Sequence, residues 1–192
     1  GGGRGAAGGD GEARGEKAQV GGMTPDRRMI ETPAGRIAAA LWPGPGDRAP
    51  LVLFHDSLGS VSLWRDFPAG LAAATGRGVI AYDRLGFGAS DPAAGRLAPD
   101  FVAAEATQGF AAVRAALGIG RFVALGHSVG GGIAICAAAA WPADCVAVVS
   151  ISAQHHNDDR IRDGIRAAKA GFAAPGALDR LARHHSDKAR WV

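Results

Sequence analysis

The sequence is short of the residues that stabilise a secreted domain or a membrane span. It has only two cysteines among 192 residues, Cys136 and Cys145, both in apolar surroundings. We therefore expect buried free thiols in a reducing compartment, because disulfide frameworks need more cysteine pairs. The longest apolar run, Ile133 to Trp141, is far shorter than the ~20 residues of a membrane-spanning helix. A signal peptide begins with basic residues that lead into an apolar segment, and this sequence has no such pattern at its N-terminus. These absences predict a cytoplasmic protein that does not contact membranes.

The sequence also has little excess of charge of one sign. The 21 basic and 18 acidic residues leave a formal net charge of +3, and no basic cluster is interleaved with aromatic residues. Nucleic acid is therefore not an expected partner. Apolar residues make up 47% of the chain and charged residues 20%. This composition and length are typical of one globular domain with its own core.

Apolar residues are rare at the start of the chain. Residues 1–22 are mostly glycine, alanine and charged residues, which bury too little apolar surface to order, so we expect a disordered tail. We expect Met23 to be the true start. At the other end, residues 190–192 stop inside a predicted helix without a C-cap signal. The sequence is therefore expected to be a fragment of a longer reading frame.

Short apolar runs alternate with helical patterns from residue 29 onward. Strands are expected at Met29–Thr32, Arg36–Trp42, Leu51–Phe54, Gly78–Tyr82, Phe122–Leu125 and Val146–Ser152. Helices are expected near Trp64–Thr75, Asp100–Leu117 and Gly131–Ala140. This alternation predicts an α/β fold with a mostly parallel, doubly wound sheet. Ligands of such sheets bind at the carboxyl ends of strands, where His55, Asp83, Ser128 and Gln154 lie.

Residues 157–192 change character. Asn157 is expected to cap a helix that Pro175 and Gly176 end. The apolar positions of this helix are Ile161, Ile165, Ala168 and Phe172. A second helix carries Leu178, Leu181 and Ala182. Two amphipathic helices without a strand between them predict the start of a helical lid. We divide the chain into a tail (1–22), a core of about six strands (23–156) and this lid segment (157–192).

The stretch Gly126–Gly130 reads Gly-His-Ser-Val-Gly and lies between an apolar strand and a helix of small residues. Strand, sharp turn and helix are the context that the G-x-S-x-G motif needs. The turn strains the backbone of Ser128, so only small residues fit at Gly126 and Gly130. Ser128 then stands exposed above a helix N-terminus that favours negative charge. The Val129 N–H becomes one of two donors to an oxyanion.

The glycines of this stretch have other interpretations. The simplest is a glycine-rich turn with an inert serine. A P-loop needs lysine after its last glycine, and residues 126–132 have none. A dinucleotide fingerprint fails because Asp91 stands where the third glycine would follow Gly86 and Gly88.

Three motifs together resemble the α/β-hydrolase superfamily: His55–Gly59, Asp83–Asp91 and the turn around Ser128. The resemblance runs from about Met29 to the end, and is greatest to bacterial esterases, epoxide hydrolases and C–C hydrolases. It implies that Ser128 is the nucleophile. It also implies a second oxyanion N–H from Ser57, with Leu58 as the neighbouring candidate, and no metal or organic cofactor. The residues expected to shape the loops are His55, Asp83, Arg84, Gly86, Gly88, Gly126 and Gly130.

The sequence departs from the family pattern in two ways. Asp56 stands where the family usually has glycine, and we expect its carboxylate to point away from the oxyanion. The family's chain order is serine, acid, histidine, yet the sequence ends before the strands that carry the last two. The catalytic acid and base are therefore expected beyond residue 192, and this segment alone is expected to be nearly inert.

Histidines within the chain give an alternative. His155 or His156 follows the sixth strand, and Asp158 or Asp159 would then be the acid. His184 and His185 are expected to be solvated or packed within the lid. His127 occupies the variable position of the motif and is expected to pack against neighbouring loops.

The leading functional hypothesis is a serine hydrolase that cleaves an ester or a similar small acyl compound through an acyl-enzyme. The alternatives are an acyltransferase of the same fold and a non-catalytic binding module or gene fragment. Epoxide hydrolases and dehalogenases usually have aspartate at the position of Ser128, which argues against both. Without later strands the sixth strand is an exposed apolar edge, so we also expect self-association through Val146–Ile151.

Overall fold

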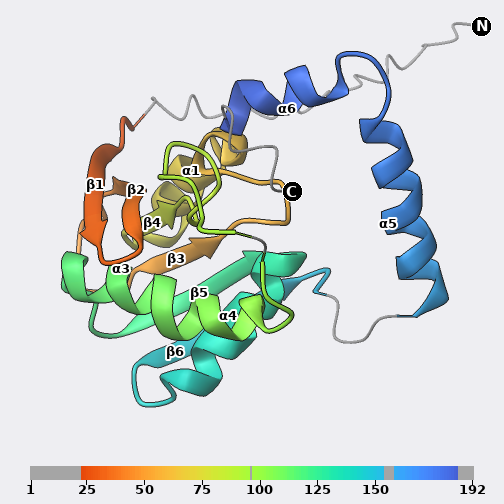
Figure 1. Ribbon diagram of the computed structural model, residues 1–192. Coiled ribbons are helices and arrows are strands. Elements are labelled where there is room, and N and C mark those ends of the chain that lie inside the picture. The colour runs from red at the N-terminus through yellow and green to blue at the C-terminus, as the bar shows by residue number, and fades with distance from the viewer. Residues whose placement is uncertain (1–22, 96, 154–157, 186–192) are drawn as a thin grey trace, which may run out of the picture.

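The computed structural model describes residues 23–95, 97–153 and 158–185 (Figure 1). Its strands are β1 (Asp26–Thr32), β2 (Gly35–Trp42), β3 (Leu51–Phe54), β4 (Val79–Tyr82), β5 (Phe122–His127) and β6 (Cys145–Ile151). They form one sheet in the order β1-β2-β4-β3-β5-β6. The pairs β3–β4, β3–β5 and β5–β6 are parallel, whereas β1–β2 and β2–β4 are antiparallel. The predicted mostly parallel sheet is confirmed.

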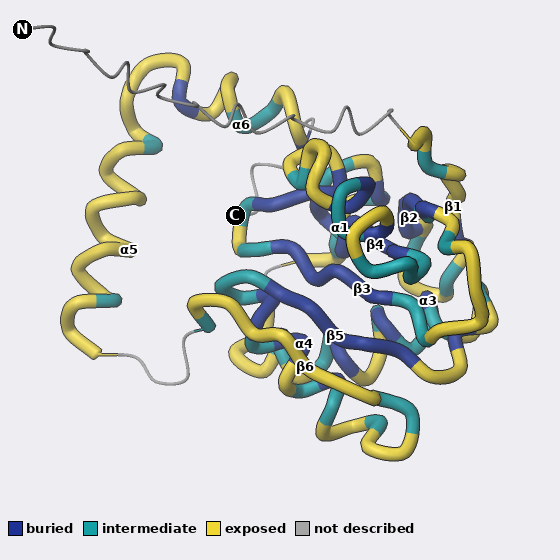
Figure 2. Tube along the Cα trace, turned by 180° about the vertical axis from the view of Figure 1, so that it is seen from behind, coloured by how far each residue is buried: buried dark blue, intermediate teal, exposed yellow. Residues whose placement is uncertain are grey.

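Helices cover both faces of the sheet, because its central strands are apolar along their whole length. In β3, Leu51 and Leu53 pack in a core with α1 (Phe67–Thr75). The alternate residues Val52 and Phe54 pack in a second core with α3 (Phe110–Leu117) and α4 (Val129–Ala140). Figure 2 shows the buried residues running through β3, β4 and β5. The doubly wound architecture is therefore confirmed, with one core on each face.

The prediction of one continuous helix at Asp100–Leu117 is wrong in one respect. The helix begins as α2 (Phe101–Ala104), passes through a π-helical turn, η2 (Glu105–Gly109), and resumes as α3. The wider turn accommodates the Glu105 carboxylate, which lies where a Cβ on Gly109 would stand. Such turns are often found at functional sites.

The helix predicted from Trp64 also begins later than expected. A 3₁₀ turn, η1 (Val61–Trp64), comes first, and α1 starts at Phe67. Pro68 lies in the first turn of α1, where a missing N–H costs no helical hydrogen bond.

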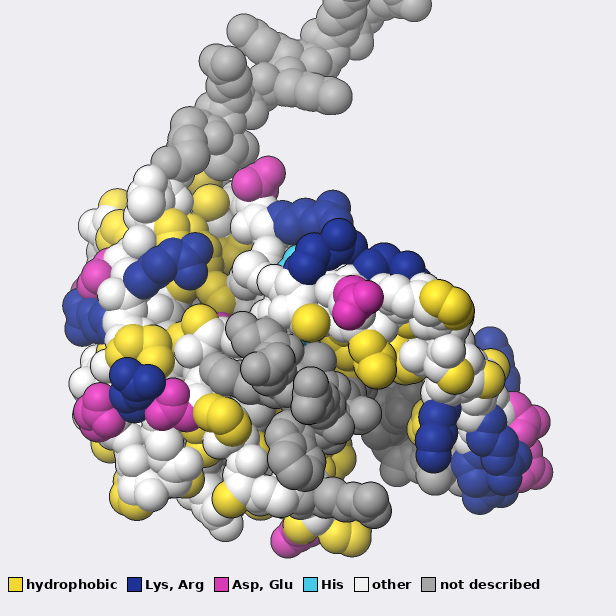
Figure 3. Space-filling model, turned by 45° about the horizontal axis from the view of Figure 1, so that its top comes forward, with side chains coloured by type: hydrophobic (Ala, Val, Ile, Leu, Met, Phe, Trp, Pro, Cys, Tyr) yellow, Lys and Arg dark blue, Asp and Glu magenta, His cyan; other side chains and the backbone are white. Residues whose placement is uncertain are grey.

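Two further helices, α5 (Asp159–Phe172) and α6 (Ala177–His185), follow the sheet. Asp158 caps α5 by accepting a hydrogen bond from the Ile161 amide over 2.9 Å; the expected cap, Asn157, lies outside the described residues. No residue of α5 is buried, and it stands away from the sheet, whereas α6 returns toward the core (Figures 1 and 2). Basic side chains gather over this part of the surface (Figure 3). They belong to Arg160, Arg162, Arg166, Lys169, Arg180 and Arg183.

Strand β6 forms an edge of the sheet, and its side chains are largely exposed. Val148, Val149 and Ile151 are each about 40% exposed. Cys136 and Cys145 are free thiols, as predicted, but they are only partly buried, whereas full burial was expected. None of the helices in the described ranges is long and apolar enough to cross a membrane.

Candidate active site

Ser128 occupies the sharp turn between β5 and α4. Its φ is 54° and its ψ is −121°, a conformation that is strained for any residue other than glycine. The Ser128 carbonyl accepts hydrogen bonds from the Gly131 and Gly132 amides at 2.9 and 3.2 Å, so α4 starts directly at the serine. Helix N-termini favour negative charge. The turn therefore holds a hydroxyl at a place where an anion is stabilised.

Backbone contact explains the two glycines of this turn. A Cβ on Gly126 would overlap the carbonyl oxygen of Gly130, and a Cβ on Gly130 would overlap the carbonyl oxygen of Phe54. Helix α4 thus rests directly on the ends of β5 and β3. A larger residue at either position would push α4 away and move Ser128. We call residues 126–130 the elbow.

The loop after β3, residues 55–60, lies beside the elbow, and we call it the oxyanion loop. Phe54 pairs with Gly126 in the sheet, so β3 and β5 end side by side. The Leu58 amide donates to Asp56 Oδ1 over 3.1 Å and is therefore engaged. Within the described ranges, the amides of Ser57 and Val129 have no hydrogen-bond partner. These two N–H groups are therefore not engaged by another group of the described residues.

His55 is buried and braces the oxyanion loop. Its Nδ1 lies 2.8 Å from the Asp56 carbonyl oxygen, and its Nε2 accepts hydrogen bonds from N and Nε of Arg84 at 3.2 and 3.3 Å. Nδ1 therefore carries the ring proton. Burial, and then the Arg84 charge, hold the pKa of His55 well below its usual value. Both ring nitrogens are occupied, so His55 has a structural role and is not free to act as a base.

Asp83 organises the loop after β4, residues 83–91, which we call the glycine loop. Its carboxylate accepts hydrogen bonds from the Val61 amide at 2.6 Å and the Ala89 amide at 2.9 Å. The Asp83 carbonyl also accepts a hydrogen bond from the Ser90 hydroxyl at 2.6 Å. Gly86 and Gly88 adopt φ values of 87° and 50° in the same loop. The loop is thus tied to η1 by a buried carboxylate.

Asp56, the departure from the family pattern, lies in the oxyanion loop and faces the elbow. Its Oδ1 accepts from Leu58, and its Oδ2 lies 3.5 Å from Nδ1 of His127. Both side chains are a little under half exposed. Asp56 therefore joins the oxyanion loop to the elbow through its own side chain.

The remaining histidines and acids fall in three groups. His155 and His156 lie outside the described residues. Asp158 caps α5, and Asp159 pairs with Arg162 one turn along that helix. His185 is fully buried, with Nδ1 3.0 Å from the Gly88 amide and Nε2 2.8 Å from the Leu58 carbonyl oxygen. No sequence pattern predicted these two contacts, because they join residues 97 and 127 positions apart.

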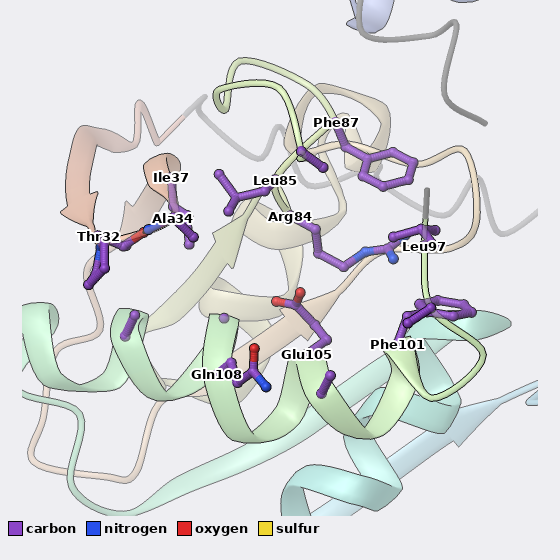
Figure 4. A pocket seen from close by; sticks show the side chains of 16 residues that line it. Thr32, Ala34, Ile37, Arg84, Leu85, Phe87, Leu97, Phe101, Glu105 and Gln108 are labelled. Carbon is purple, nitrogen blue, oxygen red and sulfur yellow. The ribbon is translucent and has the colours of Figure 1, made fainter. Parts of the chain in front are cut away.

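A cavity of about 470 Å³ lies between the glycine loop, the tip of the β1–β2 hairpin and the α2–α3 segment (Figure 4). Glu105 and Arg84 contribute its charged groups, and Tyr82 donates to Glu105 Oε1 over 2.7 Å beside it. Burial raises the pKa of Glu105, whereas the Tyr82 hydrogen bond and the Arg84 charge lower it. Neither Ser128 nor Ser57 lines this cavity.

Comparisons with known proteins agree with this geometry. A family model described as the alpha/beta hydrolase fold matches residues 49–192. The sn-1-specific diacylglycerol lipase ABHD11 of Danio rerio is 34% identical over 111 residues, which cover 57% of this chain and 33% of that protein. This chain therefore spans about a third of that curated relative.

Solved structures share the fold. An epoxide hydrolase from an endophytic Streptomyces is 27% identical, with a TM-score of 0.60. The match covers 83% of this chain and 49% of the epoxide hydrolase chain. Naproxen esterase from Bacillus subtilis is 19% identical, with a TM-score of 0.67. The match covers 90% of this chain and 64% of the esterase chain.

Proposed function

The chain belongs to the alpha/beta hydrolase fold family, and from that premise we propose that it is a serine hydrolase that cleaves an ester or a similar acyl compound. The observation that carries the proposal is the strained backbone of Ser128 (φ 54°) on top of the α4 N-terminus. Backbone strain of this kind is concentrated at functional sites. The similarity to a lipase and an esterase supports acyl substrates.

Each group has a chemical role in this proposal. The Ser128 oxygen attacks the carbonyl carbon while its proton passes to a histidine base. The amides of Ser57 and Val129 stabilise the resulting oxyanion. The alcohol leaves with the proton from the histidine, and an acyl-enzyme remains. Water then attacks the acyl-enzyme through the same base, which releases the acid and restores the Ser128 hydroxyl.

The base must be a histidine with a free ring nitrogen. His55 and His185 use both ring nitrogens in other contacts. The other two described histidines are His127, which faces Asp56 through Nδ1, and His184, which is exposed on α6; neither hydrogen-bonds to Ser128 within the described residues. We therefore assign the role to His155 or His156, with Asp158 or Asp159, or to a histidine of a longer protein. The second assignment agrees with the greater length of the matched relatives.

The test is covalent labelling of the protein expressed from its complete reading frame. A fluorophosphonate is expected to add once to the wild type, as seen by intact mass, and not to Ser128→Ala. Ser152→Ala is the matched control, because Ser152 also comes directly after a strand and also has a positive φ, of 53°. Hydrolysis of 4-nitrophenyl butyrate should fall by at least about 10³-fold in Ser128→Ala only. A folded wild type that is not labelled, or labelling that survives in Ser128→Ala, overturns the proposal.

A further inference from the structure

His185 is buried in a helix that otherwise packs little. Only Ala177 and His185 of α6 are buried, and His185 is fully inaccessible to solvent. Its ring meets the Phe87 ring edge to face, with centroids 5.7 Å apart. The two ring nitrogens reach two different loops, the glycine loop at Gly88 and the oxyanion loop at Leu58. One side chain thus joins α6 to both loops.

The partners of His185 fix its protonation state. The Gly88 amide can only donate, so Nδ1 accepts over 3.0 Å. The Leu58 carbonyl can only accept, so Nε2 carries the proton and donates over 2.8 Å. The ring is therefore neutral and held in one tautomer. A second proton, on Nδ1, would set two donors against each other and break the contact with Gly88.

The Leu58 contact bears on the oxyanion donors. The Leu58 amide is already bound to Asp56 Oδ1, and its carbonyl is bound to His185. Residue 58 is thus held at both of its backbone polar groups, next to the open amide of Ser57. The first restraint lies within the loop, and the second comes from α6.

We propose that neutral His185 is a positioning residue that fastens α6 to the oxyanion loop and holds the Ser57 amide in place, and that protonation of His185 releases α6. This inference rests on the proposed function, because the fastened loop is the one that carries a predicted oxyanion donor. His185 acts through the loop and makes no contact with substrate in this scheme.

The charges around His185 set the direction of the pH effect. Burial lowers the pKa of His185 below its usual value and outweighs the opposing contributions. The charged and titratable groups around it are His184 on α6, Asp56 and His55 on the oxyanion-loop side, and Asp83 and Arg84 on the glycine-loop side. The two carboxylates raise its pKa, and His184 lowers it. Released α6 therefore takes up the proton first, and docking weakens as the pH falls below about 6.5.

Hydrogen exchange tests the docking without any catalytic readout. At pH 7.5 and 5.0, the peptides that cover residues 84–91 and 177–185 are compared after correction for intrinsic exchange. In the wild type their protection should fall at pH 5.0, by at most about thirtyfold, because that pH lies about 1.5 below the ordinary pKa of histidine. His185→Gln keeps an N–H for Leu58 but does not titrate, so its lower protection should be the same at both pH values. His184→Gln, the neighbouring control, should behave as wild type.

Labelling by fluorophosphonate tests the positioning role. His185→Gln and His185→Ala should label more slowly than the wild type at pH 7.5, with Gln the faster of the two. Between pH 6.5 and 5.0 the labelling rates of the wild type and of His184→Gln should fall more steeply than those of the two His185 variants, which keep only the fall that comes from protonation of the catalytic base. Protection of the β3 and β5 peptides reports whether each variant is folded.

The two proposals fail in different ways. If protection of residues 84–91 and 177–185 is unchanged in His185→Gln and independent of pH in the wild type, docking by His185 is wrong even when Ser128 is labelled. If docking follows the pH but the labelling rate of His185→Gln equals that of the wild type, the positioning role is wrong. If docking follows the pH and no variant is labelled, the proposed function fails, and the positioning role fails with it.

Discussion

Asp56 and His127 lie 3.5 Å apart, from Oδ2 to Nδ1, and connect the oxyanion loop to the elbow. The same carboxylate accepts the Leu58 amide through Oδ1. In the proposed mechanism a negative charge at this place opposes the charge that develops on the oxyanion, whereas the hydrogen bond to Leu58 shapes the loop that carries a proposed oxyanion donor. The two effects can be separated by substitution.

Asp56→Asn is expected to speed fluorophosphonate labelling by about threefold. Asparagine still accepts the Leu58 amide but removes the charge, and a repulsion between partly exposed charges is worth ~0.7 kcal/mol. Asp47→Asn, which makes the same change on an exposed loop, should leave the rate unchanged. Asp56→Ala should be slower than Asp56→Asn, because Leu58 loses its acceptor. A rate for Asp56→Asn below that of the wild type would contradict the repulsion.

Gly130→Ala is expected to destabilise the fold. The added Cβ would overlap the Phe54 carbonyl oxygen, and both backbones are fixed by the sheet and by α4. Strain of this kind costs about 1–3 kcal/mol, measurable as a lower urea midpoint at an unchanged slope. Gly164→Ala in α5 is the control, because nothing lies within 4 Å of its new Cβ. It should be neutral or stabilise α5 by up to about 1 kcal/mol. Equal midpoints for Gly130→Ala and the wild type would show that α4 does not rest on β3.

Glu105→Gln is expected to change how stability depends on pH. Burial raises the pKa of Glu105 in the folded protein above the unfolded value of 4.5. Between those two values the folded state holds more protons, so stability falls as the pH rises, by at most about 1.4 kcal/mol per unit. Glutamine accepts the Tyr82 hydroxyl without titrating. The difference in unfolding free energy, variant minus wild type, should therefore grow from pH 4 to 7. A difference that is constant or shrinks with pH would contradict the burial effect.

The 192-residue chain is expected to self-associate through β6. An exposed edge strand offers unpaired backbone groups together with apolar side chains, and Val148 and Val149 are 40% and 41% exposed. Val148→Lys should shift the sedimentation distribution toward monomer. Ile165→Lys, at an apolar position 59% exposed on α5, is the control and should not. A wild-type chain that sediments as a monomer at micromolar concentration would contradict this prediction.

The sequence predicted the sheet well because its signals are local. Runs such as Leu51–Phe54 are apolar on both faces and bounded by loop residues, and the structure has a strand over that same span. The elbow was predictable for the same reason, since Gly126 and Gly130 mark a turn within five residues. Helix bounds were poorer, because the periodicity around Glu105 does not distinguish an α-turn from a π-turn.

What the sequence did not predict depends on contacts between distant segments. His185 lies on a helix whose pattern places it at a solvated end, yet it is buried against Leu58 and Gly88. Asp56 was expected to point away from the oxyanion, and its approach to His127 of the elbow was not predicted. The contacts of His185, and that of Asp56 with His127, follow from tertiary packing, which no local pattern encodes.

The register of β3 against β5 has a consequence for how the molecule comes apart. The pairing of Phe54 with Gly126 sets the oxyanion loop and the elbow level with each other, and it lies in the buried centre of the sheet. That geometry can be lost only when the central sheet unfolds, so it shares the cooperativity of the whole domain. Helix α5, with no buried residue, belongs to a separate and weaker cooperative unit. Helix α5 can therefore unfold and refold many times while the oxyanion loop and the elbow keep their spacing.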